Sequence, residues 1–350
     1  MQTATHAAND PLQLHQAESC VHVRDDFHPR FFDEIFKESP RTQAHERSLD
    51  QLPDVTAQLC GLTGDMDPYL LRRYRYNENA EFGFSKLSIR TTQDTTLPVQ
   101  FLLSNKDLSS ESQAETELED EQHLSVGNGR SLLSNLIPTE IGRRLIKLFY
   151  RFISPQFPIL LPSEPPEPET SPVHLLAAIY CLAQPFSTFD DRLCIDFAYK
   201  TPSSQKLLNI AWKSLNKSLH APTMATIQAS LILLLQPPTN ELVLDSAFKW
   251  ALMGSVVSSA QTLGLHLDAS QWRLPKNEVT LRRRLSWAVY TFDKWYALSL
   301  GRPSHVTVDD WLVVELTAID LDGEFDFNTG SLCIELSHLT RILDKVLTQL

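Results

Sequence analysis

The chain has 350 residues, of which 42% are hydrophobic, and its formal net charge is −12. This length and composition allow one large domain with flanking segments, or two domains. The negative charge excludes a protein that binds nucleic acid over its whole surface, because phosphates would repel it. The sequence contains no apolar run of membrane-spanning length and no N-terminal secretory pattern. We therefore expect a soluble, intracellular protein with no membrane contact.

The cysteines are scattered along the chain and odd in number, as is typical of free, mostly buried thiols in a reducing compartment. They are Cys20, Cys60, Cys181, Cys194 and Cys333. No two of them have the C-x2-C spacing that a structural zinc site uses. The sequence therefore predicts no structural zinc in this chain.

Residues 1–90 are expected to form an N-terminal segment that is partly ordered and packs on the main domain. Its densest apolar part, residues 54–76, ends in the alternating run Arg72-Arg73-Tyr74-Arg75-Tyr76. Such a run could stack on nucleotides. It is equally typical of a helix end whose arginines pair with nearby acids.

Residues 91–135 predict an acidic disordered linker. The stretch ESQAETELEDE at 111–121 is highly charged and has few apolar anchors. An acidic activation segment is the alternative, but such segments usually interleave aromatic residues, which this one lacks. The Gly127-x-Gly129 pair lacks the third glycine and the preceding strand of a phosphate-binding loop.

Residues 136–350 predict an all-α, multi-helix domain. Thr139 can cap a first helix that ends near Phe152, and a proline-rich acidic loop follows at residues 163–172. Apolar periodicity predicts further helices at 173–183, 191–199, 203–219, 223–235, 246–265 and 332–350. No segment longer than a few residues shows strand periodicity.

The stretch 281–306, LRRRLSWAVYTFDKWYALSLGRPSHV, is the most informative part of the sequence. Steps of three and four residues lay one apolar stripe along a helix, made of Leu281, Leu285, Ala288, Phe292, Trp295 and Leu298. Gly301 can end the helix in the left-handed conformation, and Pro303 blocks its continuation. Asp293 lies among aromatic residues and needs a partner if buried, which Arg302 or one of the arginines 282–284 could supply.

This stretch combines a basic start, a tryptophan-rich helix that contains one acid, and a Gly-Arg-Pro stop. The residues concerned are Arg282, Arg283, Arg284, Trp287, Asp293, Trp295, Gly301, Arg302 and Pro303. Two predicted helices precede it: an apolar helix at 223–235, and a helix at 246–265 with a face of small residues. Together with these helices, the stretch resembles the middle homology region of fungal zinc-cluster transcription regulators, the fungal-specific transcription factor domain. The resemblance runs from about Pro138 to the C-terminus. It implies an all-α regulatory domain that acts in the nucleus on RNA polymerase II transcription.

The resemblance also exposes two departures from the family pattern. The binuclear zinc cluster of such regulators needs six cysteines in a compact array that begins C-x2-C-x6-C, and this chain has no such array. Zinc is therefore expected only in the family's DNA-binding module, which is missing here. The helical domain of the family also continues beyond this point, so we expect a truncated domain whose last helix leaves an apolar face uncovered.

Three routes could bring such a chain to DNA: an upstream zinc cluster, a dimer partner, or another DNA-bound regulator. The expected partners are other transcription regulators or co-regulators, with a homodimer or heterodimer as options. Control of nutrient or metabolic genes follows from the type of family alone. The target genes, the inducer and the choice between activation and repression stay open.

A small-molecule sensor is the first alternative function, with an inducer pocket lined by Trp287, Trp295 and Arg302. For the same helix, a plain core role with a structural ion pair is the competing interpretation. A ligand-sized pocket with convergent polar groups would favour the sensor, and a closed core would favour the structural role.

An enzyme on a helical scaffold is the second alternative, and no motif supports it. The Glu335-x-x-His338 pair lacks the second pair that a di-iron bundle needs. The acidic run around Asp190, Asp191 and Asp196 is equally typical of a helix N-terminus, and His266-x-Asp268 of a helix end. We therefore expect neither catalysis nor a metal ion in this chain.

Overall fold

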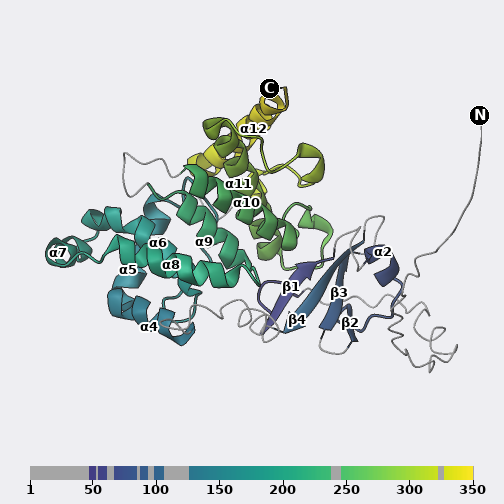
Figure 1. Cartoon of the computed structure of the whole chain (residues 1–350), viewed down its shortest axis with the longest axis horizontal. Helices are drawn as coiled ribbons and strands as arrows, with labels where there is room; N and C mark the ends of the chain where they lie inside the picture. The colour runs from purple at the N-terminus through teal and green to yellow at the C-terminus, as the bar shows by residue number, and fades with distance from the viewer. Residues whose placement is uncertain are drawn as a thin grey trace, which may run out of the picture.

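The computed structural model describes residues 47–52, 54–60, 67–84, 87–93, 98–105, 126–237, 246–321 and 327–349. Residues 1–46 and 106–125, the second of which lies within the predicted acidic linker, lie outside the described residues. A small sheet lobe, residues 47–105, lies beside a larger helical body, residues 126–349 (Figure 1). The fold is therefore helix-rich without being purely all-α, which corrects the predicted fold class.

The sheet lobe holds one four-stranded antiparallel sheet, in the order β1-β4-β3-β2. The strands are β1 (Val55–Leu59), β2 (Glu81–Phe84), β3 (Leu87–Gln93) and β4 (Val99–Asn105), and the short helix α2 (Pro68–Leu71) precedes β2. Strand β4 and the end of β3 fall inside the predicted linker, so residues 99–105 are not linker. Adjacent residues of β4, such as Gln100 and Phe101, are both fully buried. A strand covered on both faces shows no alternation of apolar and polar residues, and periodicity therefore missed it.

The helical body begins at Val126 and contains the long helices of the fold. They are α4 (Val126–Leu136), α5 (Thr139–Phe152), α6 (Val173–Ala183), α7 (Leu193–Tyr199), α8 (Ser204–Ser218), α9 (Met224–Leu234), α10 (Ser246–Thr262), α11 (Lys276–Leu300) and α12 (Phe327–Gln349). Four 3-10 helices connect them: η1 (Gln184–Phe189), η2 (Ala269–Gln271), η3 (Val308–Asp310) and η4 (Ala318–Asp320). The helices predicted from apolar periodicity are confirmed.

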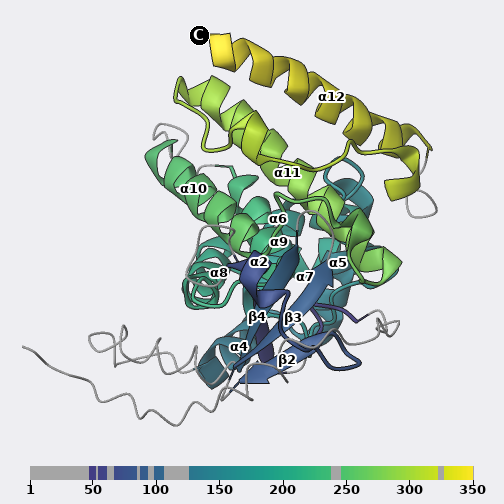
Figure 2. The ribbon, with the colours of Figure 1, turned by 90° about the vertical axis from the view of Figure 1, so that its right-hand side faces the viewer.

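Helices α6 and α9 form the centre of the body, because both are apolar on almost every side. Helix α6 packs against α5, α8 and α9. Helix α9 starts at a capping box, in which Thr223 and Thr226 satisfy each other's backbone amides. Farther out, α11 packs on α10, and α12 lies on α11 as the outermost layer (Figure 2).

A buried carboxylate joins the sheet lobe to the helical body. Glu278 on α11 accepts the backbone N–H of Leu49 at 3.2 Å and pairs with Arg282 at 3.1 Å. Arg282 also donates to the Leu263 carbonyl at 2.8 Å and lies over the ring of Trp272. On the lobe side, Phe101 meets the edge of Trp272 at a centroid distance of 5.4 Å. These contacts, together with the hydrogen bond from the Met224 N–H to Asp50 at 3.0 Å, hold the residues from 47 onward against the helical body.

Candidate functional site

Helix α11 and the loop that follows it carry the nine residues of the family motif that the sequence singled out, from Arg282 to Pro303. The helix runs over Lys276–Leu300 and ends where Gly301 adopts the left-handed conformation, with φ of +58°. The N–H of Arg302 then donates to the Ala297 carbonyl at 3.0 Å, which satisfies one of the last carbonyls of the helix. The predicted Gly301 helix end is confirmed, and the chain turns back along α11 after Pro303.

Asp293 is fully buried at the point where the returning chain meets α11. Its carboxylate accepts the backbone N–H of Val306 at 3.0 Å and the N–H of His305 at 3.2 Å. It also contacts the His305 ring nitrogen Nδ1 at 2.8 Å and the Ser304 hydroxyl. The predicted arginine partner was therefore wrong. Two backbone amides, a hydroxyl and an imidazole of the Ser304–Val306 turn satisfy the buried charge.

Lys294, next to Asp293, was missed by the sequence reasoning. Its side chain is only 2% exposed, and Nζ lies 2.6 Å from Asp344 Oδ1 on α12. Nζ also donates to the Ser304 hydroxyl at 2.7 Å and to the Val306 carbonyl. A lysine inside a tryptophan-rich helix was the available signal, since a buried ammonium requires acidic or carbonyl partners. The adjacent residues 293 and 294 thus fasten the Ser304–Val306 turn and α12 to α11.

The three consecutive arginines point to three different neighbours. Arg282 joins α11 to Glu278 and the sheet lobe, as described above. Arg283 pairs with Asp320 in η4 and lies 3.6 Å from Asp268 beside η2. Arg284 is buried, 4% exposed, and lines the same small depression as Phe157. The basic run therefore holds neighbouring elements in place and does not form one exposed cationic surface.

Trp287, Trp295 and Arg302 do not converge on a common pocket. Trp287 is buried and its indole N–H donates to the Val314 carbonyl at 2.7 Å. Trp295 is 36% exposed, more than the apolar stripe predicted, and donates to Thr340 of α12 at 3.0 Å. Arg302 lies over the ring of Trp250 on α10, 5.8 Å from its centroid.

The cavity beside Trp287 has a volume of about 30 Å³, and neither Trp295 nor Arg302 lines it. That volume is far below the several hundred cubic ångströms of a typical ligand pocket, so this depression does not form an inducer site.

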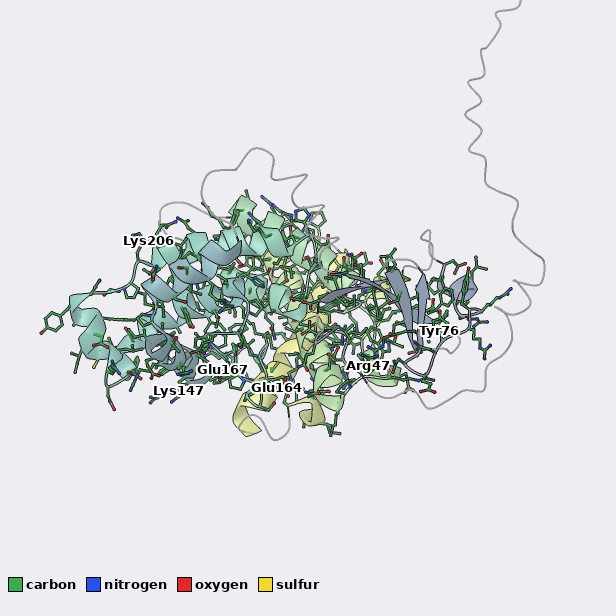
Figure 3. The ribbon with its side chains drawn as sticks, turned by 90° about the horizontal axis from the view of Figure 1, so that it is seen from below. Arg47, Tyr76, Lys147, Glu164, Glu167 and Lys206 are labelled. Carbon is green, nitrogen blue, oxygen red and sulfur yellow. The ribbon has the colours of Figure 1, made fainter. Side chains whose placement is uncertain are left out.

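A larger groove lies elsewhere, between helix α5 and the proline-rich loop. Its volume is about 520 Å³, and its apolar lining comes from Ile146, Tyr150, Pro162, Pro165 and Pro166. The charged residues Arg143, Lys147 and Glu167 complete the lining, and the last two are labelled in Figure 3. Arg143 contacts Glu140 and Glu169 at 2.9 and 3.1 Å. The groove has the size of a small-molecule site, and sequence periodicity gave no signal for it.

Asp190, the first acid of the run considered as a catalytic or metal-binding site, has a structural role. Asp190 caps α7 by accepting the backbone N–H groups of Leu193 and Arg192 at 2.9 and 3.0 Å, and it pairs with Arg144. Burial raises the pKa of Asp190, but these hydrogen bonds and the arginine outweigh it, so the pKa lies below its ordinary value. Within the described ranges, no group of three or more His, Cys, Asp or Glu side chains is placed to hold a metal ion.

His338 and Cys333 on α12 complete the set of candidate reactive residues. His338 Nε2 on α12 lies 3.9 Å from Glu315 Oε2, and both side chains are exposed. Burial raises the pKa of Cys333 to about 11, as it does for Cys60 and Cys181. Such thiols are protonated at neutral pH and therefore poor nucleophiles. No helix in the described part of the chain is both long and apolar enough to cross a membrane.

Comparison with known proteins places this arrangement in a family. The model of the fungal specific transcription factor domain matches residues 146–350, more than half of the chain. The chain belongs to this family. The matched region covers the second half of α5 and every helix from α6 to α12, including the turn held by Asp293.

Several curated relatives are named as transcription regulators. The chain is 28% identical over 300 residues to "Uncharacterized transcriptional regulatory protein C25B8.11" of Schizosaccharomyces pombe, covering 82% of this chain and 44% of that protein. It is 30% identical over 280 residues to "Transcriptional activator protein DAL81" of Saccharomyces cerevisiae, covering 78% and 26%. It is 27% identical over 192 residues to "Cutinase transcription factor 1 alpha" of Fusarium vanettenii, covering 53% and 21%. The chain thus spans less than half the length of these relatives. No solved structure matches it with statistical significance.

Proposed function

We propose that this chain is the regulatory part of a nuclear regulator of RNA polymerase II transcription that controls nutrient or metabolic genes. The observation that carries the proposal is the family match, which spans nearly the whole helical body. The names of two relatives, a transcriptional activator and a cutinase transcription factor, support a role in gene expression. On this proposal the chain reaches DNA through a zinc cluster outside these 350 residues or through a partner regulator.

The structure supports a role in protein interaction. Its charged residues on α11 are engaged in joining elements, with Glu278, Asp293 and Lys294 all buried. The net charge of −12 disfavours direct binding of the whole surface to DNA. A body of this kind can transmit or receive a signal through contacts with other proteins.

Chromatin immunoprecipitation of the tagged protein, expressed from its own gene, tests the proposal. We expect enrichment at a defined set of promoters and altered transcription of those genes when the gene is deleted. A strain that carries Lys294→Met should show no enrichment at these promoters and should transcribe the genes as the deletion strain does, because the ion pair between α11 and α12 is broken. A strain that carries Lys206→Met should behave like the wild type. Absence of the protein from promoters, with unchanged transcription on deletion, would contradict the proposal.

A second candidate function is inducer sensing at the groove of α5. We propose it because that groove has ligand-sized volume, about 520 Å³, whereas the cavity beside Trp287 does not. The ligand would be a small carboxylate with an apolar body, which would pack on Tyr150 and the prolines while Lys147 binds the carboxylate. A thermal-shift screen of aliphatic and aromatic carboxylates tests it. A rise in Tm that Lys147→Gln abolishes would support the site, and no rise with any acid would remove it.

A further inference from the structure

The proline-rich acidic loop at residues 163–172 ends in a Ser-Pro pair at the surface of the helical body. Ser171 is half-buried, and its neighbours Thr170 and Pro172 are exposed. The Ser171 hydroxyl accepts the backbone N–H of Glu167 at 2.8 Å, which closes a turn of the loop. Pro172 follows in extended backbone, with φ of −56° and ψ of 138°, directly before α6. A serine near the surface that is followed by an extended proline has the local form that proline-directed protein kinases recognise.

Arg130 on α4 holds the loop at this serine. Its guanidinium donates to the Ser171 carbonyl, and to the Pro168 carbonyl at 2.8 Å. Among the described residues it forms no ion pair with a carboxylate. Guanidinium and phosphate groups form short, charge-assisted and often bidentate hydrogen bonds. Arg130 is therefore placed to bind a phosphate carried by the Ser171 hydroxyl.

The acidic residues of the loop pair with a different arginine. Glu167 and Glu169 lie 3.8 and 3.1 Å from Arg143 on α5, and their side chains are 57% and 51% exposed. Repulsion between these exposed carboxylates and a phosphate is screened by water and salt. Arg130 is half-buried, so its attraction to the phosphate is screened less. The attraction therefore outweighs the repulsion.

Two further Ser-Pro or Thr-Pro pairs lie in the described part of the chain, and neither combines these features. The serine of the first, Ser154, is fully buried. The threonine of the second, Thr201, is exposed, but its hydroxyl donates to the Phe197 carbonyl at 2.6 Å. No arginine donates to residue 201 within the described ranges. Of the three pairs, the one at Ser171 joins an accessible hydroxyl to an arginine, and Thr201 supplies a matched control.

We propose that Ser171 is a phosphorylation site for a proline-directed protein kinase, and that Arg130 binds the phosphate. The γ-phosphoryl group of ATP passes to Ser171 Oγ, the bond from the γ-phosphorus to ADP breaks, and the hydroxyl proton leaves. The phosphoserine carries roughly two negative charges at neutral pH and lies close to the N-terminus of α6, where negative charge is favourable. The modification therefore fastens the loop and the start of α6 to α4.

Incubation of the 350-residue chain with ATP and a mitogen-activated protein kinase, followed by peptide mass spectrometry, tests the site. We expect phosphate on Ser171 in the wild type and in Thr201→Ala, and its loss from the loop peptide in Ser171→Ala. A synthetic peptide of residues 163–176 serves as the reference substrate. A chain that stays unmodified at Ser171 while the peptide is phosphorylated would overturn the proposal, because the folded loop would then exclude the kinase. A peptide that is not phosphorylated would overturn it as well, because the sequence would then not be a substrate.

Phosphorus NMR of the phosphorylated chain tests the role of Arg130. In the wild type the second pKa of the phosphate should lie about one unit below its value in the phosphorylated peptide, because the guanidinium favours the dianion. Arg130→Gln should remove this difference. Arg192→Gln, which removes an exposed arginine paired with Asp196, should keep it. Equal pKa values of the phosphate in the wild-type chain and in the peptide would overturn the proposal.

Discussion

Lys294 Nζ on α11 lies 2.6 Å from Asp344 Oδ1 on α12, and both side chains are buried. This ion pair is a buried charged contact between the last described helix and the body, whereas the pair of Arg341 with Glu315 is exposed. We expect Lys294→Met to lower the free energy of unfolding by about 3–5 kcal/mol, because the Asp344 carboxylate stays buried without its partner. Urea denaturation followed by circular dichroism measures the change.

Two further variants isolate the ion pair. Lys206→Met removes an exposed lysine and should change the free energy of unfolding by less than about 0.5 kcal/mol. The double variant K294M/D344L removes both charges and should recover much of the loss. Equal destabilisation by the double and the single variant would show that the lost stability comes from packing and not from the unpaired charge.

Glu278 provides a second joint, between α11 and the sheet lobe. Glu278→Ala leaves the Arg282 guanidinium buried without its carboxylate and removes the acceptor of the Leu49 amide. We expect Tm to fall and trypsin to cleave after Arg47 more quickly, since residues 47–52 lose one of their anchors while the hydrogen bond between Asp50 and the Met224 amide remains. Glu140→Ala, at a 67% exposed side chain on α5, is the control and should leave both unchanged. Equal cleavage rates in the two variants would show that Glu278 does not hold the lobe.

Alanine substitutions at Gly264 and Gly301, the two glycines with positive φ, distinguish the cost of backbone strain from the cost of a steric clash. A Cβ at Gly264 would lie 2.9 Å from Trp272 and 3.2 Å from Phe101, whereas one at Gly301 would meet nothing within 4 Å. Gly301→Ala should therefore cost only the left-handed backbone penalty of about 1–2 kcal/mol. Gly264→Ala should cost clearly more, because Trp272 is packed between the lobe and α11. Midpoints of urea unfolding compare the two, and similar midpoints would contradict the close packing at Gly264.

His174 on α6 makes stability depend on pH. Burial lowers its pKa from 6.5 to about 4, so the unfolded chain binds the proton more readily than the folded one. Stability is therefore fully present above pH 6.5 and declines as the pH falls toward 4, by roughly 2 kcal/mol at pH 5. Unfolding measured at pH 7 and pH 5 should show this decline in the wild type and in the exposed control His220→Gln. In His174→Gln the loss of stability between pH 7 and pH 5 should be smaller. An unchanged loss would show that other titratable groups cause it.

The parts of the fold that follow from local sequence were predictable. Apolar periodicity located the helices, and Gly301 followed by Pro303 located the end of α11, because these signals act within a few residues. The sheet was not predictable in this way. Strand β4 is buried on both faces, so it shows no alternation, and its pairing with β1 joins residues far apart in the chain.

The candidate site was predictable in its location but not in its contacts. The sequence singled out Asp293 as a buried acid that needs a partner, but the turn at Ser304–Val306 supplies that partner only after the chain reverses at Gly301. Trp295 lies on the predicted apolar stripe, yet it is at the edge of the interface with α12 and remains 36% exposed. Helical spacing predicts which face of a helix is buried, but it does not predict how much of that face the neighbouring helix covers.

The central claim, that this chain regulates transcription, is tested most directly by fusing it to a heterologous DNA-binding domain in a fungal host that carries a matching reporter. We predict that the fusion changes reporter expression relative to the DNA-binding domain alone, and that the destabilising Lys294→Met variant loses the effect while Lys206→Met retains it. A fusion that is expressed, folded and bound at the reporter, but leaves its expression unchanged, would contradict the claim.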